Sequence, residues 1–256
     1  MKIRMSLAAL ASSAAVASAQ PHGGDIVLQL VDSKIATAIC DDNGQIFPAC
    51  TFEGEMAGGE TDEPGFDSGQ GEFPDGCEIG FTIRRALREW AAGTFETIPD
   101  ERLAISWGPF GPVTTPTDDT PVEGFPLGVS AGGEFHCHYD FVLSGPAEPG
   151  VYLLELGMWS DRPEIGPSEP LYIVFNNGMD EVVHEEAIAW WEANRAWCTA
   201  QDCVADFNGD GVVDTRDVIV CLNAWTAGDP AADTNGDGAV DSRDVIFFLN
   251  LWTTGC

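Results

Sequence analysis

Basic side chains are scarce in this sequence of 256 residues, which has 11 Lys and Arg against 42 Asp and Glu and a formal net charge of -31. A surface this negative repels the phosphates of DNA and RNA, and anionic membranes, before any contact forms. The composition therefore excludes nucleic-acid binding. Because 44% of the residues are hydrophobic, with 8 Trp and 14 Phe, the chain is not of the disordered class either. The length predicts one domain of ordinary size and a smaller one.

Several motifs that would identify a class of enzyme or metal site are also missing. None of the eight cysteines lies in a C-x-x-C pair, which argues against a zinc ribbon or a redox site. No G-x-S-x-G, H-E-x-x-H or P-loop is present, so the signatures of common hydrolases and of phosphoryl transfer are absent. No stretch is long and apolar enough to span a bilayer, and we do not expect a membrane-embedded protein.

The N-terminus has the three regions of a secretory signal peptide. Lys2 and Arg4 precede the apolar run 5–16, and residues 17–19 read Ala-Ser-Ala, as at a cleavage site. We expect cleavage near Ala19, which removes two basic residues and no acid and changes the net charge from -31 to -33. The predicted location is therefore secreted, either extracellular or at the cell surface, where disulfides persist.

The C-terminal region contains an internal duplication. Residues 206–226 and 233–253, separated by a shift of 27, are identical at 15 of 21 positions. In each copy, oxygen-bearing side chains occupy positions 1, 3, 5, 9 and 12 of a loop with Gly at position 6, the pattern of an EF-hand calcium loop. Calcium takes about six to eight oxygen ligands, so alternate residues of a tightly curled loop point at the ion and position 7 contributes its carbonyl.

Two Ca²⁺ sites are therefore predicted, one in each copy. The first set of ligands is Asp206, Asn208, Asp210, Val212, Asp214 and Asp217. The second set is Asp233, Asn235, Asp237, Ala239, Asp241 and Asp244. Asp replaces the usual Glu at position 12, so its backbone must lie closer to the ion. A solvated acidic turn is the alternative, but it does not account for two copies with every ligand position filled.

A helical pattern follows each loop, with apolar residues at helix spacing in 218–225 and 245–252. No comparable helix fits before either loop, because 199–205 is short and 227–232 contains Gly and Pro. A duplicated calcium loop with only the exiting helix resembles the type I dockerin. Through this module, secreted bacterial polysaccharide-degrading enzymes bind cohesin receptors. The resemblance covers residues 203–256.

The resemblance implies that a partner is recognised at loop positions 10 and 11 and along the helix that follows. These positions are Thr215 and Arg216 in the first copy and Ser242 and Arg243 in the second. Their near identity is similar to that of dockerins that bind in two orientations. Arg stands where many family members carry a second small hydroxyl residue, so the partner is either cohesin-like or another, acidic surface receptor. Pairing of the arginines with neighbouring carboxylates is the alternative to a docking role.

The repeat also suggests a disulfide between Cys203 and Cys256, because a two-fold-related pair of loop-helix units would bring the ends of the module together. In the chain-entropy model, closing a loop of this length stabilises a domain by about 4 kcal/mol. Cys221 aligns with Phe248, so it is expected to be a buried thiol or to pair with Cys198.

Residues 20–177 are predicted to form a mainly β domain, a sandwich or jelly roll. Short β-rich segments are separated by Gly and Pro clusters without alternating helices. The expected strands are 25–31, 34–40, 104–107, 134–143, 150–158 and 170–175. Residues 81–92 fit a helix or a strand, and Gly93 favours a strand that ends in a hairpin turn.

The period becomes helical between Met179 and Ala196, which predicts a closing helix. The predicted organisation is a signal peptide at 1–19, the β domain at 20–177, a helix and linker at 178–198, and a small all-α module of two calcium loop-helix repeats at 199–256. Within the β domain, residues 53–76 hold eight acids, seven glycines and no basic residue. We expect them to form a solvated, unordered loop, with a further calcium site as the alternative.

Residues 135–141 read Phe-His-Cys-His-Tyr-Asp-Phe. On a strand, His136, His138 and Asp140 share one face. Two histidines at i and i+2 can chelate one transition metal such as Zn²⁺, with Asp140 or a loop residue such as His184 completing the site. A polar, solvent-facing strand side is the alternative. With the Pro-Gly-Val-Tyr that begins the next strand, the segment resembles the H-x-H/PG-x-Y β-sandwich domains of bacterial surface-anchored proteins.

Three functions fit these features. The leading hypothesis is a secreted calcium-binding protein whose dockerin-like module mediates docking or anchoring and displays a non-catalytic β-sandwich. The second is a dockerin-tethered glycoside hydrolase in polysaccharide degradation, which needs two carboxylates about 5 to 9.5 Å apart. Acids are too numerous for such a pair to be chosen, so no catalytic residue is named and a carbohydrate ligand stays open. The third is a zinc-binding surface protein that uses His136 and His138.

Overall fold

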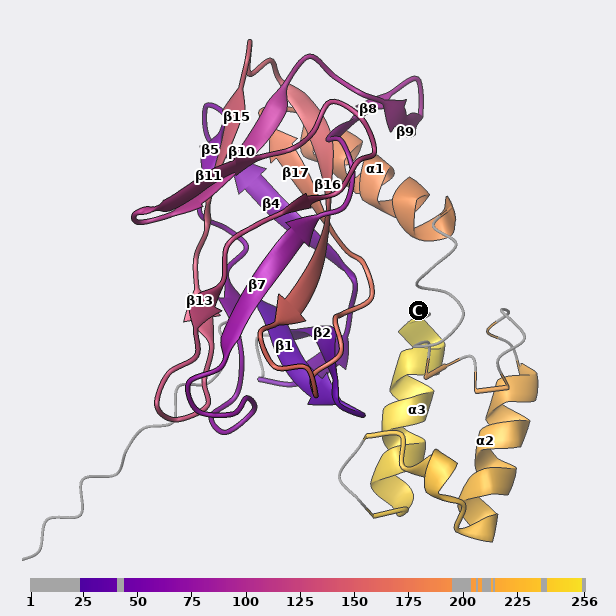
Figure 1. The fold of residues 1–256 in the computed structure, drawn as a ribbon. Helices are drawn as coiled ribbons and strands as arrows, with labels where there is room; N and C mark the ends of the chain where they lie inside the picture. Colours follow the sequence, from indigo (N-terminus) through magenta and orange to yellow (C-terminus); the bar gives the residue numbers. More distant parts are fainter. Residues whose placement is uncertain are drawn as a thin grey trace, which may run out of the picture.

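The computed structural model describes residues 24–40, 44–194, 204–205, 207–208, 213, 215–235 and 239–254. Within them, strands dominate the N-terminal region and helices form a small C-terminal part (Figure 1). The predicted fold class is confirmed. The predicted signal peptide lies outside the described residues. None of the helices in the described part of the chain is long and apolar enough to cross a membrane.

The first sheet brings the start of the domain next to the H-x-H segment. Its strand order is β14-β6-β1-β2-β3. The strands are β1 (Ile26–Val31), β2 (Lys34–Cys40), β3 (Ile46–Pro48), β6 (Phe66–Asp67) and β14 (His136–Cys137). β1 and β2 form a hairpin around Asp32 and Ser33, whose φ angles of 51° and 62° fit a type I′ turn. β6 pairs in parallel with β1 and antiparallel with β14, so these three strands lie together.

Two further sheets complete the domain. The second has the order β11-β10-β15-β5 and consists of β5 (Glu60–Thr61), β10 (Arg102–Trp107), β11 (Phe110–Thr114) and β15 (Asp140–Ser144). The third has the order β12-β7-β16-β17-β4 and consists of β4 (Thr51–Met56), β7 (Glu78–Ile83), β12 (Val122–Glu123), β16 (Gly150–Ser160) and β17 (Leu171–Asn177). Beside it lie β13 (Leu127–Gly128), β8 (Arg88–Ala91) and β9 (Thr94–Thr97). The chain passes from the first sheet to the second at His138 and Tyr139.

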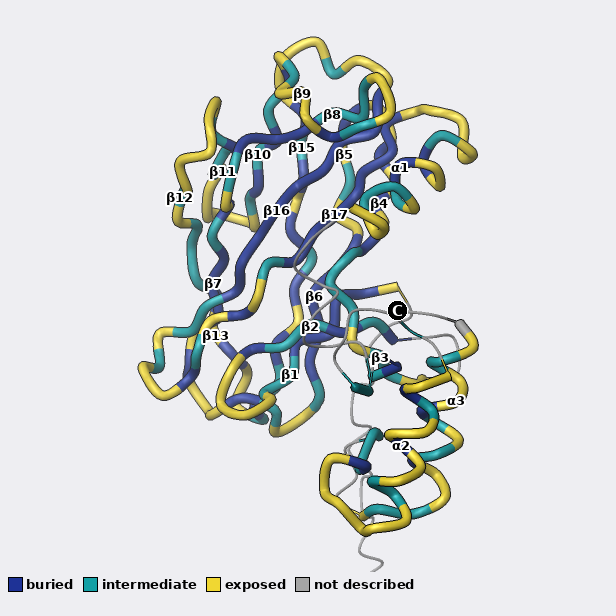
Figure 2. Tube along the Cα trace, turned by 90° about the vertical axis from the view of Figure 1, so that its right-hand side faces the viewer, coloured by how far each residue is buried: buried dark blue, intermediate teal, exposed yellow. Residues whose placement is uncertain are grey.

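A single large apolar core lies between the sheets. Every residue of β17 is buried, and so are the first nine residues of β16, shown in dark blue in Figure 2. Successive residues of these strands alternate between two faces: Leu154 contributes to the main core and Leu153 to a second cluster on the opposite face. Both faces of the third sheet are therefore covered, which explains why β16 and β17 are apolar over long runs.

Helix α1 (Glu181–Asn194) covers the second face of the third sheet (Figures 1 and 2). Ala187 is fully buried there, and the Trp191 ring lies 4.8 Å from that of Tyr172 in β17. The predicted closing helix is confirmed. Residues 81–92 are strand and not helix, as Gly93 favoured, but they belong to two strands, β7 and β8. β8 and β9 form the expected hairpin around Gly93, which has a φ of 78°.

Most predicted strands agree with the structure to within a few residues, but two expectations are wrong. Residues 134–143 form two strands, β14 and β15, in different sheets. Residues 53–76 are not an unordered loop, because β4, β5 and β6 pair there with β17, β15 and β1. In β4 the acids Glu53 and Glu55 are exposed and alternate with buried Phe52, Gly54 and Met56. The segment is therefore ordered by edge-strand pairing and a few apolar anchors, with its charges in water.

The C-terminal part consists of α2 (Thr215–Ala227), the short 3-10 helix η1 (Pro230–Ala232) and α3 (Ser242–Thr254). Both predicted helices are confirmed, and each begins at position 10 of its loop. Phe207 packs against Phe248 of α3 with ring centroids 5.9 Å apart. Phe247 of α3 stacks on Phe47 of β3 with ring centroids 6.3 Å apart, which places this helix beside the first sheet.

Cys77, Cys137 and Cys221 have free thiols and are buried. Cys40 is buried as well. Cys50 is disulfide-bonded. Of the two alternatives for Cys221, the buried thiol is correct and the pairing with Cys198 is wrong. Burial, together with the negative charge of Asp244, raises the pKa of the Cys221 thiol to about 11. Both cysteines of the predicted Cys203–Cys256 bond lie outside the described residues.

Candidate functional site

The twelfth residues of the two predicted calcium loops occupy the same position in both repeats. Asp217 and Asp244 lie in the first turns of α2 and α3 and are 0% and 1% exposed. The backbone N–H of Asn208 donates to Oδ1 of Asp217 at 3.1 Å, and the equivalent N–H of Asn235 donates to Oδ1 of Asp244 at 3.3 Å. In each repeat the third loop residue is thus bonded to the aspartate at position 12, at the start of the helix that follows.

In the second loop the structure also describes residues 239–244, which lead into α3. The Asp241 N–H donates to Oδ2 of Asp244 at 2.7 Å, and the Thr234 hydroxyl donates to the Asp244 carbonyl at 2.7 Å. The Arg243 guanidinium lies 3.4 Å from the Asp241 carboxylate, so this arginine does pair with a neighbouring acid while its side chain remains 73% exposed. Burying carboxylates is costly without compensating charge, and a divalent cation supplies that charge.

The remaining loop positions divide into described and undescribed residues. Asp233, Asn235, Ala239 and Asp241 are described with Asn208, Asp217 and Asp244. Asp206, Asp210, Val212, Asp214 and Asp237 lie outside the described residues. The complete ligand sets therefore stay predictions.

One further contact ties the two repeats together. The indole Nε1 of Trp225 in α2 donates to the carbonyl of Asp241, at position 9 of the second loop, at 2.7 Å. The first helix therefore holds the second loop. The apolar core of the two repeats is small. Of the residues described after 203, the fully buried apolar ones are Ala205, Cys221, Ala232 and Phe248.

Two equivalent surfaces face solvent on this part of the chain. We call face 1 the residues Thr215, Arg216, Ile219 and Leu222 of α2, and face 2 the residues Ser242, Arg243, Ile246 and Leu249 of α3. All eight are exposed. Ile219 is 59% and Ile246 60% exposed, which is high for isoleucine. Half of the apolar residues that predicted α2 and α3 are therefore exposed. The buried sides of these helices carry Cys221 and Phe248.

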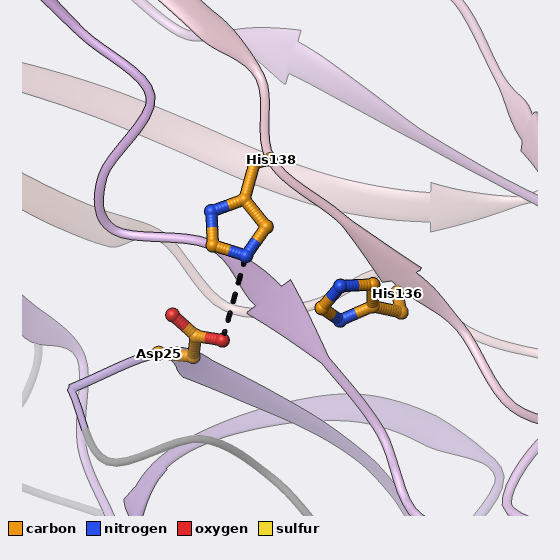
Figure 3. Close-up of side chains that lie close together, drawn as sticks. All are labelled: Asp25, His136 and His138. Atoms are coloured by element: carbon orange, nitrogen blue, oxygen red, sulfur yellow. Dashed lines mark ion pairs between the residues drawn. The ribbon is translucent and has the colours of Figure 1, made fainter. Parts of the chain in front are cut away.

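A second constellation lies where β1, β6 and β14 meet. Ligand atoms of Asp25, His136 and His138 all lie within 4.8 Å of one another (Figure 3). The imidazole centroids are 5.2 Å apart, and Nε2 of His138 is 3.9 Å from Oδ2 of Asp25. Asp25 is buried, whereas His136 is exposed and His138 is half-buried, so the site opens to solvent. Two imidazoles and one carboxylate are ligands typical of zinc and other first-row transition metals.

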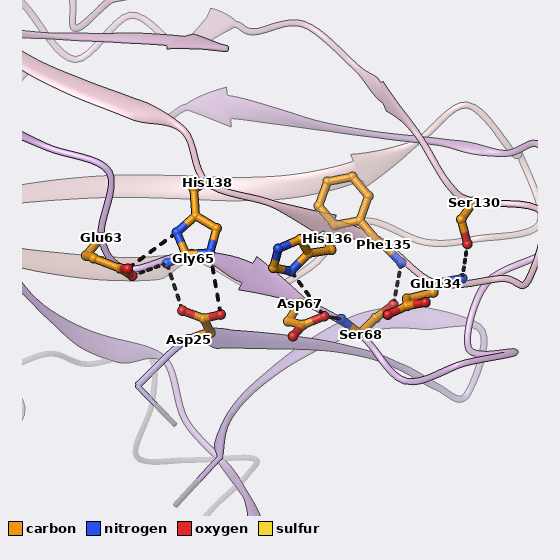
Figure 4. A network of polar contacts seen from close by, with 10 residues as sticks. All are labelled: Asp25, Glu63, Gly65, Asp67, Ser68, Ser130, Glu134, Phe135, His136 and His138. Atoms are coloured by element: carbon orange, nitrogen blue, oxygen red, sulfur yellow. Dashed lines mark hydrogen bonds and ion pairs between the residues drawn. The ribbon is translucent and has the colours of Figure 1, made fainter. Parts of the chain in front are cut away.

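The surroundings orient both histidines (Figure 4). Nδ1 of His138 lies 3.1 Å from the Asp62 carbonyl. Because a carbonyl can only accept, Nδ1 carries a proton, and in a neutral ring Nε2 is then the nitrogen available to a metal, on the side of Asp25. Nδ1 of His136 lies 3.6 Å from the buried carboxylate of Asp67. Such outer carbonyl or carboxylate partners are usual for metal-binding histidines.

Gly65 forms the floor of this site. Its N–H donates to Oδ1 of Asp25 at 3.1 Å and to Oε2 of Glu63 at 3.1 Å. A Cβ at this position would approach Cε1 and Nε2 of His138 to 2.6 and 2.7 Å and Oδ1 of Asp25 to 2.9 Å. Only glycine therefore allows the carboxylate and the imidazole to approach as closely as they do.

The histidine pair was predicted, but its third partner was not. The expected alternation is confirmed, with Phe135, Cys137, Tyr139 and Phe141 all buried. His184 is in helix α1, where its ligand atoms group with Glu55 and Glu181 instead. Among the described residues, the group formed with the two histidines contains Asp25 and not Asp140 or His184. Asp25 precedes β1 and reaches the histidines only through strand pairing, so local spacing could not reveal it.

Glu89 and Glu101 are a pair of acids whose charges interact, as the two carboxylates of a hydrolase do. Burial raises the pKa of Glu89, and the nearby charge of Glu101 raises it further. The Glu101 carboxylate, however, accepts the backbone N–H of Glu148 at 3.3 Å. This bond gives Glu101 a structural role in the loop before β16. The pair therefore does not by itself favour the hydrolase hypothesis.

Comparison with protein families identifies the C-terminal part of the chain. Residues 204–250 match the dockerin type I domain, so this part is a type I dockerin, as the repeat predicted. The match supports a docking or anchoring module, calcium as its ion and a cohesin-type partner. Comparisons with curated proteins and with solved structures found no match. The resemblance of the N-terminal region to surface-anchored β-sandwich domains stays a prediction.

Proposed function

We propose that this chain is a secreted protein that docks onto a cohesin-type receptor through two calcium loops and their exiting helices, and so displays the β-sandwich. The observation that carries the proposal is that both the buried aspartate of the calcium loop and the exposed helix face occur twice. Asp217 and Asp244 occupy the same buried position in each repeat, and faces 1 and 2 are both exposed. The proposed organisation is export after cleavage near Ala19, a non-catalytic domain at 20–177, and a docking module at 199–256.

Calcium acts in this proposal as a structural switch. One ion in each loop neutralises the carboxylates around it, including the buried residue at position 12. The loop then fixes the first turn of its helix, and with it residues 10 and 11. Without calcium, the like charges of each loop repel and the small core cannot hold the helices in place.

The two faces offer a receptor the same chemistry twice. Each has a hydroxyl, an arginine and two aliphatic side chains along one side of a helix. Aliphatic residues provide apolar contact, and the arginine suits an acidic receptor surface. Since the faces are nearly identical, either can dock, and the sandwich is held in one of two orientations.

The proposal is tested by capture of receptors from the secreted fraction of the source organism on the immobilised full chain. We expect cohesin-bearing proteins to be captured in calcium and released by EGTA. The double variants Ile219→Asp/Leu222→Asp and Ile246→Asp/Leu249→Asp should each retain capture, with a loss of about twofold in affinity, because one face remains. The variant that carries all four substitutions should lose capture.

A matched control is Val182→Asp, which places a charge on an exposed apolar residue of α1, outside both faces. This variant should bind like the unmodified chain. Capture that survives EGTA, or that persists in the variant with all four substitutions, would contradict docking through these faces.

A second candidate function is metal binding at Asp25, His136 and His138. The specific observation in its favour is that a carboxylate far away in sequence meets both imidazoles, with His138 held in the tautomer that presents Nε2. Zn²⁺ suits this ligand set, and the exposed side leaves room for water as a fourth ligand. This function concerns the displayed domain and is independent of docking.

Cobalt substitution tests this candidate, since Co²⁺ in a nitrogen and oxygen site gives visible absorption bands. We expect these bands to weaken strongly in Asp25→Asn and in Gly65→Ala, whose Cβ displaces the ligands. Asp140→Asn is the matched control, because Asp140 is an exposed acid on the neighbouring strand. Bands that are equal in Asp25→Asn and Asp140→Asn would show that Asp25 is no ligand.

A further inference from the structure

His184 is a buried imidazole whose environment leaves one ring nitrogen directed at two acids. The side chain is 1% exposed. Its Nε2 lies 3.0 Å from the backbone carbonyl of Val174 in β17. A carbonyl can only accept, so Nε2 carries a proton and donates it to this bond. Nδ1 is buried and has no hydrogen-bond partner among the described residues.

This nitrogen, which makes no hydrogen bond, faces two carboxylates that come from other parts of the chain. Ligand atoms of Glu55, Glu181 and His184 lie within 4.8 Å of one another. Oε1 of Glu55 is 3.1 Å from Nδ1, although the angles do not make a hydrogen bond. Glu55 belongs to the edge strand β4, and Glu181 begins α1. The glutamates are exposed, so an ion can enter from solvent and reach the buried nitrogen last.

We propose that Glu55, Glu181 and His184 bind Zn²⁺ and that the ion fastens helix α1 to the edge strand β4. A neutral imidazole that donates one nitrogen to a backbone carbonyl presents the other as a metal ligand, which is the usual arrangement in zinc sites. The separation of 3.1 Å between Nδ1 and Oε1 suits two ligands of one ion, since Zn–N and Zn–O bonds are about 2.0 to 2.2 Å.

The ligand types select zinc over calcium. Calcium binds oxygen ligands, about six to eight of them, whereas this group offers one nitrogen and two carboxylates. Water completes the coordination on the exposed side. The chain thus separates two metals, with calcium in the loops of the dockerin and zinc at the helix that precedes it.

The position of the site gives the ion a structural task. α1 covers the apolar face formed by β16 and β17, and its first turn carries Glu181 and His184. β4 pairs with β17 on one side only and is the edge of the third sheet. An ion shared by Glu55 and the first turn of α1 joins the helix to the sheet beyond their apolar contact.

The test is hydrogen exchange measured by mass spectrometry on the full chain in millimolar calcium, with and without zinc chloride. We expect zinc to slow exchange at least about tenfold in peptides that cover residues 51–56 and 181–194. The variant Glu55→Gln/Glu181→Gln should lose this protection, because it removes both carboxylates and changes no buried residue.

Two comparisons make the result specific. Glu185→Gln/Glu186→Gln removes the same charge from exposed positions of α1 and should keep the protection. Asp25→Asn disables only the other proposed metal site and should keep it as well. Equal zinc protection in Glu55→Gln/Glu181→Gln and in the unmodified chain would overturn the proposal, and so would the absence of protection in the unmodified chain.

Discussion

The β-sandwich and the dockerin module of this chain are held together by different forces. The sandwich encloses a continuous apolar core to which all three sheets contribute. The described part of the module has four fully buried apolar residues, together with the buried carboxylates Asp217 and Asp244. Burial of apolar surface therefore accounts for the first region, whereas in the second the calcium ions that we propose would supply much of the stability.

Because of this difference, we expect only one part of the chain to respond to calcium. Buried acids destabilise a fold when they lack a counter-ion and stabilise it when the ion is present. The module places them at the first turn of each docking helix. The β domain also buries acids, but Glu155 there pairs with Arg84 and Arg85, and many others, such as Glu53 and Glu55 of β4, are exposed. Calcium removal should therefore unfold the module and leave the displayed domain intact.

The largest expected effect is on the reactivity of one cysteine. Cys221 is buried, and burial raises the pKa of its thiol to about 11, so it should resist alkylation at pH 8 while calcium keeps the module folded. With EGTA we expect alkylation of Cys221 to accelerate at least about 100-fold, because the protecting structure opens. Cys137, whose pKa burial raises to about 12, should stay protected in both conditions. Mass spectrometry of alkylated peptides measures both residues in one sample.

The comparison would fail if both cysteines reacted on calcium removal, or if neither did. The first outcome would mean that the sandwich depends on calcium as well. The second would mean that the small core of the module suffices without the ion.

The next effect should be confined to the sandwich. Leu154→Ala truncates a fully buried side chain of β16. We expect a loss of about 2 to 5 kcal/mol in the free energy of unfolding of this domain, from lost burial and the cavity left behind. Denaturant unfolding measures the loss, and calcium binding by the module should not change. Ile219→Ala is the control, because this side chain is mostly exposed and its loss should cost less than about 0.5 kcal/mol.

The smallest effect concerns the contact between the repeats. Trp225→Phe keeps an aromatic ring but removes the hydrogen bond to the Asp241 carbonyl. We expect the calcium-loaded module to lose about 0.5 to 1.5 kcal/mol, the usual net value of one such bond. Denaturant unfolding in saturating calcium measures this change. Trp107→Phe, at a partly exposed position of β10, should alter neither region by a comparable amount.

Local patterns in the sequence predicted the fold class, the three α-helices and several of the strands. The β1 to β2 hairpin, β16, β17 and all three α-helices follow from alternation, turn residues and helical period. The prediction for residues 53–76 was wrong, because it relied on their acidic composition and not on the alternation of apolar and polar residues. The acids there suggested disorder, although Phe52 to Met56 alternates buried and exposed positions like any edge strand. Pairing with β17 supplies the order that the composition alone could not.

The sites were predictable to the extent that their residues are close in sequence. The calcium loops lie within contiguous segments, so spacing alone indicated them. The resemblance to dockerins indicated the residues at positions 10 and 11 of faces 1 and 2, and the structure added their exposed aliphatic residues. Asp25 joins His136 and His138 through the pairing of β1, β6 and β14, and Glu55 joins His184 through β4 and α1. Such partners depend on which strands become neighbours, and this is decided by packing of the whole domain.

The central position of β17 has a mechanical consequence for a tethered protein. Drag on the sandwich, opposed by a docked module, pulls on the chain that follows α1. Once α1 is peeled away, the tension acts along β17, which is hydrogen-bonded to β16 on one side and to β4 on the other. Both ladders then carry the load in shear, so many bonds resist together instead of opening one after another. A protein built in this way tolerates flow better than one whose last strand lies at the edge of a sheet.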